Sequence, residues 1–313
     1  MRISYLDYAR FFAMYLVILG HLYNGENFFP HHYIYAFHMP LFFIVSGMLH
    51  KESERVLWKK YLKTLLVPFV VFNFLWICLF FIGLSPFGID INAIFERIKN
   101  SGIIPGPTWF LLSLFYCRVI LDYSMKYPLL VFLLWLCCFL CLNRFSFLKD
   151  IWLAQAIMAM PFYYIGCHNK ETITRIINSN SKYSLWGGVI SLVLLLLITR
   201  LHGRVSMKGV KFCFDNSSLL LTVPVFYFNA FCGSFMILFF SALFKPRRII
   251  TDLAKALITI LCVHYLFIFP SIHLFGWNAS LYVTIPISII ILMLSYLVHI
   301  IIAKYCPFII GKS

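Results

Sequence analysis

Long apolar segments, separated by short polar connections, follow one another along almost the whole chain. Several of them reach the roughly 20 consecutive apolar residues that an α-helix needs to cross the hydrocarbon core of a bilayer. Strands of an outer-membrane barrel alternate apolar and polar residues in pieces of about ten, and this sequence does not follow that pattern. We therefore predict an all-α polytopic membrane protein.

The apolar segments predict about ten transmembrane helices in one bundle. Their expected ranges are 7–24, 33–49, 64–84, 108–123, 128–142, 151–167, 184–199, 219–243, 254–272 and 281–303. These spans and their connections use up all 313 residues, so we expect a single transmembrane domain over residues 1–313 with no appended soluble domain. The first apolar segment lacks a small-residue cleavage site and is not predicted to be a cleaved signal peptide.

The composition agrees with this class of protein. Hydrophobic residues make up 62% of the chain and charged residues 12%, whereas soluble domains are about half apolar and a quarter charged. The net charge of +15 comes from basic residues spread between the apolar segments. Because flanking positive charge is typical of membrane topology, we expect no nucleic-acid partner. Most cysteines lie inside apolar segments, where cysteine acts as a small hydrophobe, so neither a metal site nor a disulfide framework is predicted.

The distribution of Lys and Arg predicts the orientation. With the N-terminus in the cytoplasm, sixteen of the 26 basic residues lie on the inner side, eight on the outer side and two inside spans. Cytoplasmic loops carry an excess of Lys and Arg, so we predict that both termini are cytoplasmic. The basic loop 200–211 runs against this bias. Either it contacts an anionic substrate outside, or one of the spans is miscounted.

The first span, "LDYARFFAMYLVILGH", carries three polar residues: Asp7, Arg10 and His21. Eleven residues at about 100° each bring Arg10 and His21 within roughly 20° of one direction, about 16 Å apart along the axis. Asp7 lies one turn before Arg10, close enough to pair with it. Ionisable groups inside a membrane are costly and mark a functional site by default. The stripe therefore predicts a polar cavity or substrate path; the alternative is an interfacial anchor beside a loop-end histidine.

Polar or small residues also interrupt other predicted spans: His38, Ser46 and Gly47 in the second, Trp109 and Arg118 in the fourth, and His264 in the ninth. Ordinary explanations exist for each kind, such as close packing at small residues and an interfacial tryptophan belt. Arg118 needs a polar partner, and we expect Asp122 at i+4 to supply it. The sequence contains no phosphate-binding glycine loop, HExxH or GxSxG motif.

The same segments resemble a known family. "LDYARFFAMYLVILGH" resembles the opening signature of the bacterial acyltransferase family 3, and "FHMPLFFIVSGML" resembles its second-helix block. "PTWFLLSLF", "PFYYIGCHNK" and "TILCVHYLFI" resemble its later blocks in the same order. The nearest subgroup is that of the fucose 4-O-acetylase-like proteins of exopolysaccharide and O-antigen modification.

The resemblance implies a ten-helix enzyme of the bacterial inner membrane that transfers an acetyl group from cytoplasmic acetyl-CoA to a carbohydrate hydroxyl. It implies that Arg10 and His21 are the essential pair. The other matching positions are His38, Ser46, Gly47, Trp109 and His264. A basic motif of some relatives has no clean match here, and its nearest candidates are Arg55, Lys59, Lys60 and Lys63. The implied partners are a surface polysaccharide or lipid-linked glycan and membrane lipid, while a homo-oligomer stays open.

Acetyl transfer needs a base for the sugar hydroxyl and a donor group for the oxyanion. We expect "RVLWKKYLK" to bind the CoA phosphates and Arg10 to position the donor, because a guanidinium does not deprotonate in proteins. Neutral His21 or His38 can be the base, with His21 favoured, and transient acetylation of His21 is an alternative. A flippase for a sugar or lipid-linked glycan would also use intramembrane Arg and His, and a structural or sensor protein would show no activity.

Overall fold

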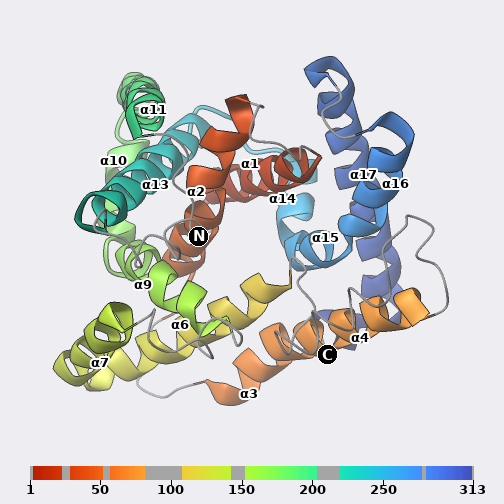
Figure 1. The fold of residues 1–313 in the computed structure, drawn as a ribbon, viewed down its shortest axis with the longest axis horizontal. Helices are drawn as coiled ribbons and strands as arrows, with labels where there is room; N and C mark the ends of the chain where they lie inside the picture. The colour runs from red at the N-terminus through yellow and green to blue at the C-terminus, as the bar shows by residue number, and fades with distance from the viewer. Residues whose placement is uncertain are drawn as a thin grey trace. The chain divides into compact units, whose positions relative to one another are not determined.

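The computed structural model describes residues 3–22, 29–51, 57–81, 108–141, 152–202, 219–276 and 280–311. Within these ranges the chain is helical and has no strand, so the predicted all-α class is confirmed (Figure 1). The elements are α1 (Ser4–His21), α2 (Phe29–Met48), α3 (Trp58–Tyr61), η1 (Leu62–Leu66), α4 (Val67–Phe81), α6 (Trp109–Lys126), α7 (Pro128–Leu140), α9 (Leu153–His168), α10 (Lys170–Asn178), α11 (Ser181–His202), α13 (Leu219–Ser241), α14 (Arg248–Lys255), α15 (Leu257–Val263), α16 (Tyr265–Phe275), α17 (Leu281–Tyr305) and η2 (Pro307–Ile310).

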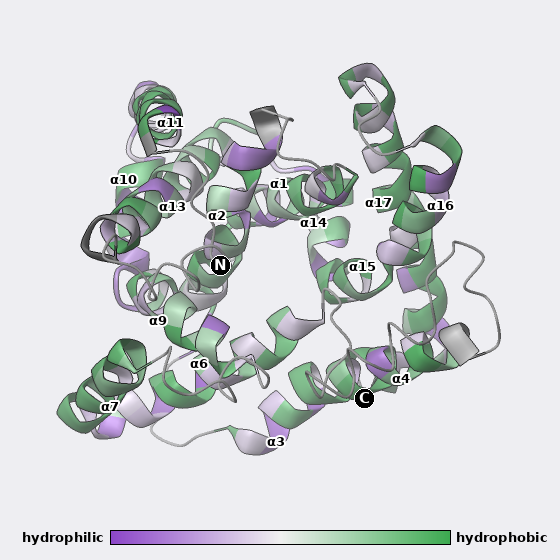
Figure 2. Cartoon of the chain, in the orientation of Figure 1, coloured by the Kyte–Doolittle hydropathy of each residue, from purple (hydrophilic) through white to green (hydrophobic). Residues whose placement is uncertain are grey.

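Several of these helices can cross a membrane. Among the described residues, four are long and apolar enough: Trp58–Cys78, Ser181–Leu201, Thr222–Ser241 and Leu281–Tyr305. The bent pair α15 and α16 makes a fifth if it forms one broken span. Figure 2 shows that α7 is hydrophobic over most of its length, and many large apolar side chains of α7 and α11 are exposed. Lipid is the solvent that such surfaces require, so the protein is a multi-pass membrane protein.

Most predicted boundaries differ from the helix ends by a few residues, and two spans differ in a more informative way. The range 254–272 is not one straight helix, because α14 ends at Lys255, a new helix starts at Leu257, and the chain bends by 45° at His264. The range 64–84 begins earlier in the structure, at Trp58, because the five-residue π-helical turn η1 joins α3 to α4 without ending the helix.

The chain divides into two compact units, the first made of the described residues within Met1–His50, Ala159–Leu257 and Trp277–Leu292. In this unit α1 packs against α2, α13 and α14, and most of its side chains are buried. A largely apolar helix that is buried on most sides belongs to the interior of a bundle. The polar residues of α1 therefore lie among protein side chains of this unit.

Two glycines allow α2 and α9 to approach closely within the first unit. A Cβ atom on Gly47 would lie 2.1 Å from the backbone oxygen of Tyr163, and one on Gly166 would lie 2.2 Å from the backbone oxygen of Ile44. Small residues permit such close contact between membrane helices. A hydrogen bond of 2.9 Å between His50 Nδ1 and Tyr163 Oη joins the same two segments. Gly47, a predicted site residue, thus serves helix packing here.

The second unit is made of the described residues within Lys51–Met158, Ile258–Gly276 and Met293–Ser313. Here η1 packs against α3, α4 and α6. Buried polar contacts connect its helices: Trp76 Nε1 on α4 donates to the backbone oxygen of Cys262 on α15 at 3.1 Å, and Thr259 Oγ1 on α15 lies 2.7 Å from His299 Nδ1 on α17. These bonds satisfy polar groups that would otherwise be costly to bury.

Candidate functional site

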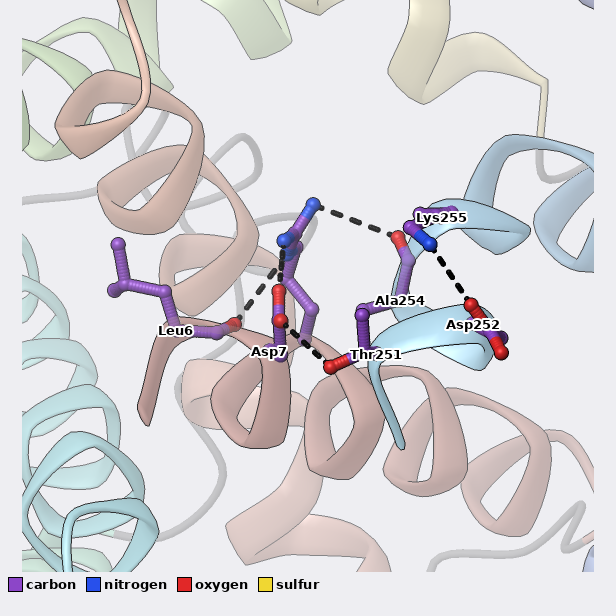
Figure 3. A network of polar contacts seen from close by, with 7 residues as sticks. Leu6, Asp7, Thr251, Asp252, Ala254 and Lys255 are labelled. Carbon is purple, nitrogen blue, oxygen red and sulfur yellow. Dashed lines mark hydrogen bonds and ion pairs between the residues drawn. The ribbon is translucent and has the colours of Figure 1, made fainter. Parts of the chain in front are cut away.

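Arg10 is held in place by its own helix and by α14. Its Nη2 donates to Asp7 Oδ1 in an ion pair, its Nε donates to the backbone oxygen of Leu6 at 3.3 Å, and its Nη1 donates to the backbone oxygen of Ala254 at 3.4 Å. Thr251 Oγ1 donates to the second carboxylate oxygen of Asp7 at 3.2 Å. Figure 3 shows the Asp7 carboxylate and the Thr251 hydroxyl turned toward each other across the contact between α1 and α14.

Most of this ion pair is buried. The Asp7 side chain is 4% exposed and the Arg10 side chain 22% exposed, so each charge depends on the other for compensation. The planar guanidinium fork donates to three acceptors on two helices. Such a group can donate hydrogen bonds to a bound molecule but cannot act as a base.

A second polar cluster lies where the end of α1 meets the first half of α2. His21 Nδ1 lies 3.1 Å from Tyr35 Oη. The Tyr35 ring contacts two further histidines of α2, with ring centroids 4.0 Å from His31 and 4.9 Å from His38. Tyr35 therefore connects His21 to His38, the two histidines that the sequence nominates as a base.

The tautomer of His38 follows from its backbone contact. His38 Nδ1 lies 2.7 Å from the backbone oxygen of Ile34. A carbonyl oxygen only accepts, so Nδ1 carries the hydrogen and donates it. In the neutral ring the lone pair is then on Nε2, which is the nitrogen that can accept a proton.

Ser46 lies half-buried on α2 in the first unit, next to Gly47. The remaining predicted residues lie in the second unit or outside the described ranges. Trp109 stacks on Trp152 at the start of α6, with centroids 5.5 Å apart. His264 is buried at the bend after α15, where its Nδ1 donates to the backbone oxygen of Ile260 at 3.0 Å. Three lysines of the predicted CoA segment are exposed on α3 and η1: Lys59, Lys60 and Lys63. Arg55 lies outside the described residues.

Arg118 has a contact that the sequence did not predict. Its guanidinium carbon lies 5.5 Å from the centroid of the Tyr61 ring, a cation–π distance. The Tyr61 hydroxyl in turn donates to Asp122 Oδ2 at 2.8 Å. Arg118 and its expected partner Asp122 thus share Tyr61 as a neighbour.

Sequence reasoning missed three side chains of the first unit's clusters: His31, Tyr35 and Thr251. A signal for Tyr35 was present, because His31, Tyr35 and His38 follow the i, i+4, i+7 spacing of one helix face. No local signal pointed to Thr251, which lies 244 residues after Asp7. Among the residues that the structure describes, no three His, Cys, Asp or Glu side chains gather closely enough to hold a metal ion.

A family model described as an acyltransferase domain matches residues 3–304. This range contains both polar clusters and every other candidate residue named above. No curated protein and no solved structure matches the chain. Because the family model covers nearly the whole sequence, the membrane protein is an acyltransferase, and its chain belongs to acyltransferase family 3.

Proposed function

We propose that the protein is an O-acetyltransferase of the bacterial inner membrane, which transfers an acetyl group from cytoplasmic acetyl-CoA to a hydroxyl of a cell-surface or lipid-linked carbohydrate. The observation that supports this most is the cluster of His21, Tyr35 and His38 in a chain of an acyltransferase family. Within the family, the resemblance of the sequence favours the fucose 4-O-acetylase-like subgroup.

The proposal uses one transmembrane domain over residues 1–313, with ten spans and both termini in the cytoplasm. In that orientation the Arg10 end of α1 faces the cytoplasm, and the His21 end faces the other side of the membrane. Arg10 then contacts the donor from inside, while the carbohydrate reaches His21. The basic candidates of residues 55–63 are proposed separately as contacts of the CoA phosphates.

The proposed reaction is a direct acyl transfer. His21 Nε2 takes the proton from the carbohydrate hydroxyl, and the oxygen forms a bond to the carbonyl carbon of the acetyl thioester. The carbon–sulfur bond then breaks, and the CoA sulfur leaves with the proton that His21 had taken. The geometry favours Nε2 because Nδ1 faces the Tyr35 hydroxyl. Arg10 positions the donor and takes no part in proton transfer.

The test is acetyl transfer by membranes that contain the protein, radiolabelled acetyl-CoA and the glycan acceptor. We expect label in the glycan, and we expect His21→Ala to lower the rate by about 100-fold or more, the usual contribution of a general base. His168→Ala removes an exposed histidine at the end of α9 and is the matched control. Transfer by His21→Ala at the wild-type rate would show that the base is wrongly assigned, and glycan moved without label would indicate a carrier.

A further inference from the structure

The Tyr35 hydroxyl has no part in the reaction described above, although it touches the proposed base. We propose that Tyr35 is a positioning residue that holds the His21 ring and leaves Nε2 as its basic nitrogen. This inference rests on the proposed function, because it assigns Tyr35 a role that acts through His21.

The Tyr35 hydroxyl lies between two groups of α1. Its oxygen is 3.1 Å from His21 Nδ1 and 3.5 Å from the backbone oxygen of Gly20. A carbonyl only accepts, so the single hydroxyl hydrogen is donated to Gly20, and the hydroxyl oxygen accepts from His21 Nδ1–H. The reverse arrangement, with the hydroxyl donating to Nδ1, would leave the Gly20 contact without a hydrogen. The arrangement that makes both bonds leaves the lone pair of neutral His21 on Nε2.

The ring of Tyr35 is itself fixed by both helices. A Cβ atom on Gly20 would lie 2.9 Å from Tyr35 Cε2, so only glycine leaves room for the ring at this point of α1. The ring also packs against the buried pair Leu19 and Ile34, and it contacts the His31 ring on its own helix. These contacts set the place of the hydroxyl before any substrate binds, which is the condition for orienting a catalytic group.

The hydrogen bonds from His21 to Tyr35 and from Tyr35 to Gly20 can both persist when His21 is charged. When Nε2 takes a proton from the carbohydrate, Nδ1–H continues to donate to Tyr35 Oη, and the Tyr35 hydrogen continues to point at the Gly20 oxygen. No proton leaves Tyr35 in this step. The hydroxyl and the backbone carbonyl together take the orienting role that a carboxylate has in a Ser-His-Asp triad.

The experiment compares Tyr35→Phe with two other variants in the acetyl-transfer assay. We expect Tyr35→Phe to lower kcat by roughly 10- to 100-fold, the range that misplacement of a catalytic group produces, with the KM for acetyl-CoA within about twofold of wild type. Gly20→Ala should lower kcat similarly, because its methyl group displaces the ring. Tyr15 also packs against Leu19 and Ile34, so Tyr15→Phe removes a hydroxyl from the same surroundings and should retain the wild-type kcat.

A double-mutant comparison separates positioning from a structural role. If Tyr35 acts through His21, Tyr35→Phe causes no further loss of the residual activity in the His21→Ala background. An equal loss in both backgrounds would overturn the inference, as would a wild-type kcat of Tyr35→Phe when His21→Ala is inactive. Full activity of His21→Ala would instead overturn the proposed base and the role of Tyr35 together, and a wild-type protein that transfers no acetyl group would overturn the proposed function.

Discussion

Replacing Asp7 by asparagine tests how Arg10 is held. The carboxylate uses both oxygens, one with Arg10 Nη2 and the other with Thr251 Oγ1. Asparagine has nearly the same shape, so its amide oxygen can accept from Arg10 and its NH2 group can donate to the Thr251 hydroxyl. The substitution therefore removes the negative charge while the hydrogen-bond geometry is kept.

The expected cost follows from the burial of the pair. Removing one partner of a fully buried ion pair costs about 3–5 kcal/mol, because the other charge is left uncompensated. Here the Arg10 side chain is 22% exposed and keeps the backbone oxygens of Leu6 and Ala254 as acceptors. We therefore expect Asp7→Asn to lower the free energy of unfolding by about 2 kcal/mol. Asp7→Ala, which also loses hydrogen bonds, should lower it by about 3 kcal/mol.

The assay is thermal unfolding of purified protein in detergent, together with the KM for acetyl-CoA. Asp252→Asn is the matched control, because Asp252 belongs to a pair with Lys255 on the exposed side of α14 (Figure 3). An exposed pair contributes about 0–1 kcal/mol, so this control should remain close to wild type. Equal stability of Asp7→Asn and Asp252→Asn would refute the reasoning that the buried carboxylate compensates Arg10.

Two further substitutions probe packing in the two units by the same unfolding measurement. Gly47→Ala should lower the free energy of unfolding by about 2–3 kcal/mol, because its methyl group meets backbone on α9 that cannot move aside. The control Gly187→Ala should lower it by less, because its methyl group meets only the end of a phenylalanine ring. Equal losses in the two variants would contradict the packing argument. Tyr61→Phe should destabilise by about 1–2 kcal/mol, because it removes the donor to Asp122, and a neutral effect would show that this bond does not contribute.

Local patterns were sufficient to predict the helices and one part of the site. Runs of apolar residues that lack the alternation of barrel strands satisfy their backbone in lipid as helices, and each predicted span contains helix in the described ranges. The spacing of three residues between Asp7 and Arg10 predicted that they can pair, and the structure contains that pair. The number of spans stays a prediction. The polar residues that mark a site also make a helix less apolar, so that α1 is not among the described helices that are long and apolar enough to cross a membrane.

Contacts between distant segments could not be read from local patterns. The α14 groups that hold Asp7 and Arg10 come from a short amphipathic helix that the sequence reading had merged in part into the span 254–272. The i+4 rule offered Asp122 as the partner of Arg118, but that rule describes one helix alone. Tyr61 reaches both residues from another helix, and only the fold brings it there.

The two polar clusters of the first unit lie at opposite ends of α1. Arg10 and His21 are eleven residues apart on one continuous helix, which separates them by about 16 Å along the axis. Arg10 is fixed to α14 and His21 is fixed to Tyr35 of α2, so neither side chain is free to reach the place of the other. The guanidinium therefore cannot stabilise an oxyanion at the carbon beside His21. A single molecule that contacts both must span about 16 Å, which suits the extended pantetheine arm of the proposed donor better than it suits a compact sugar.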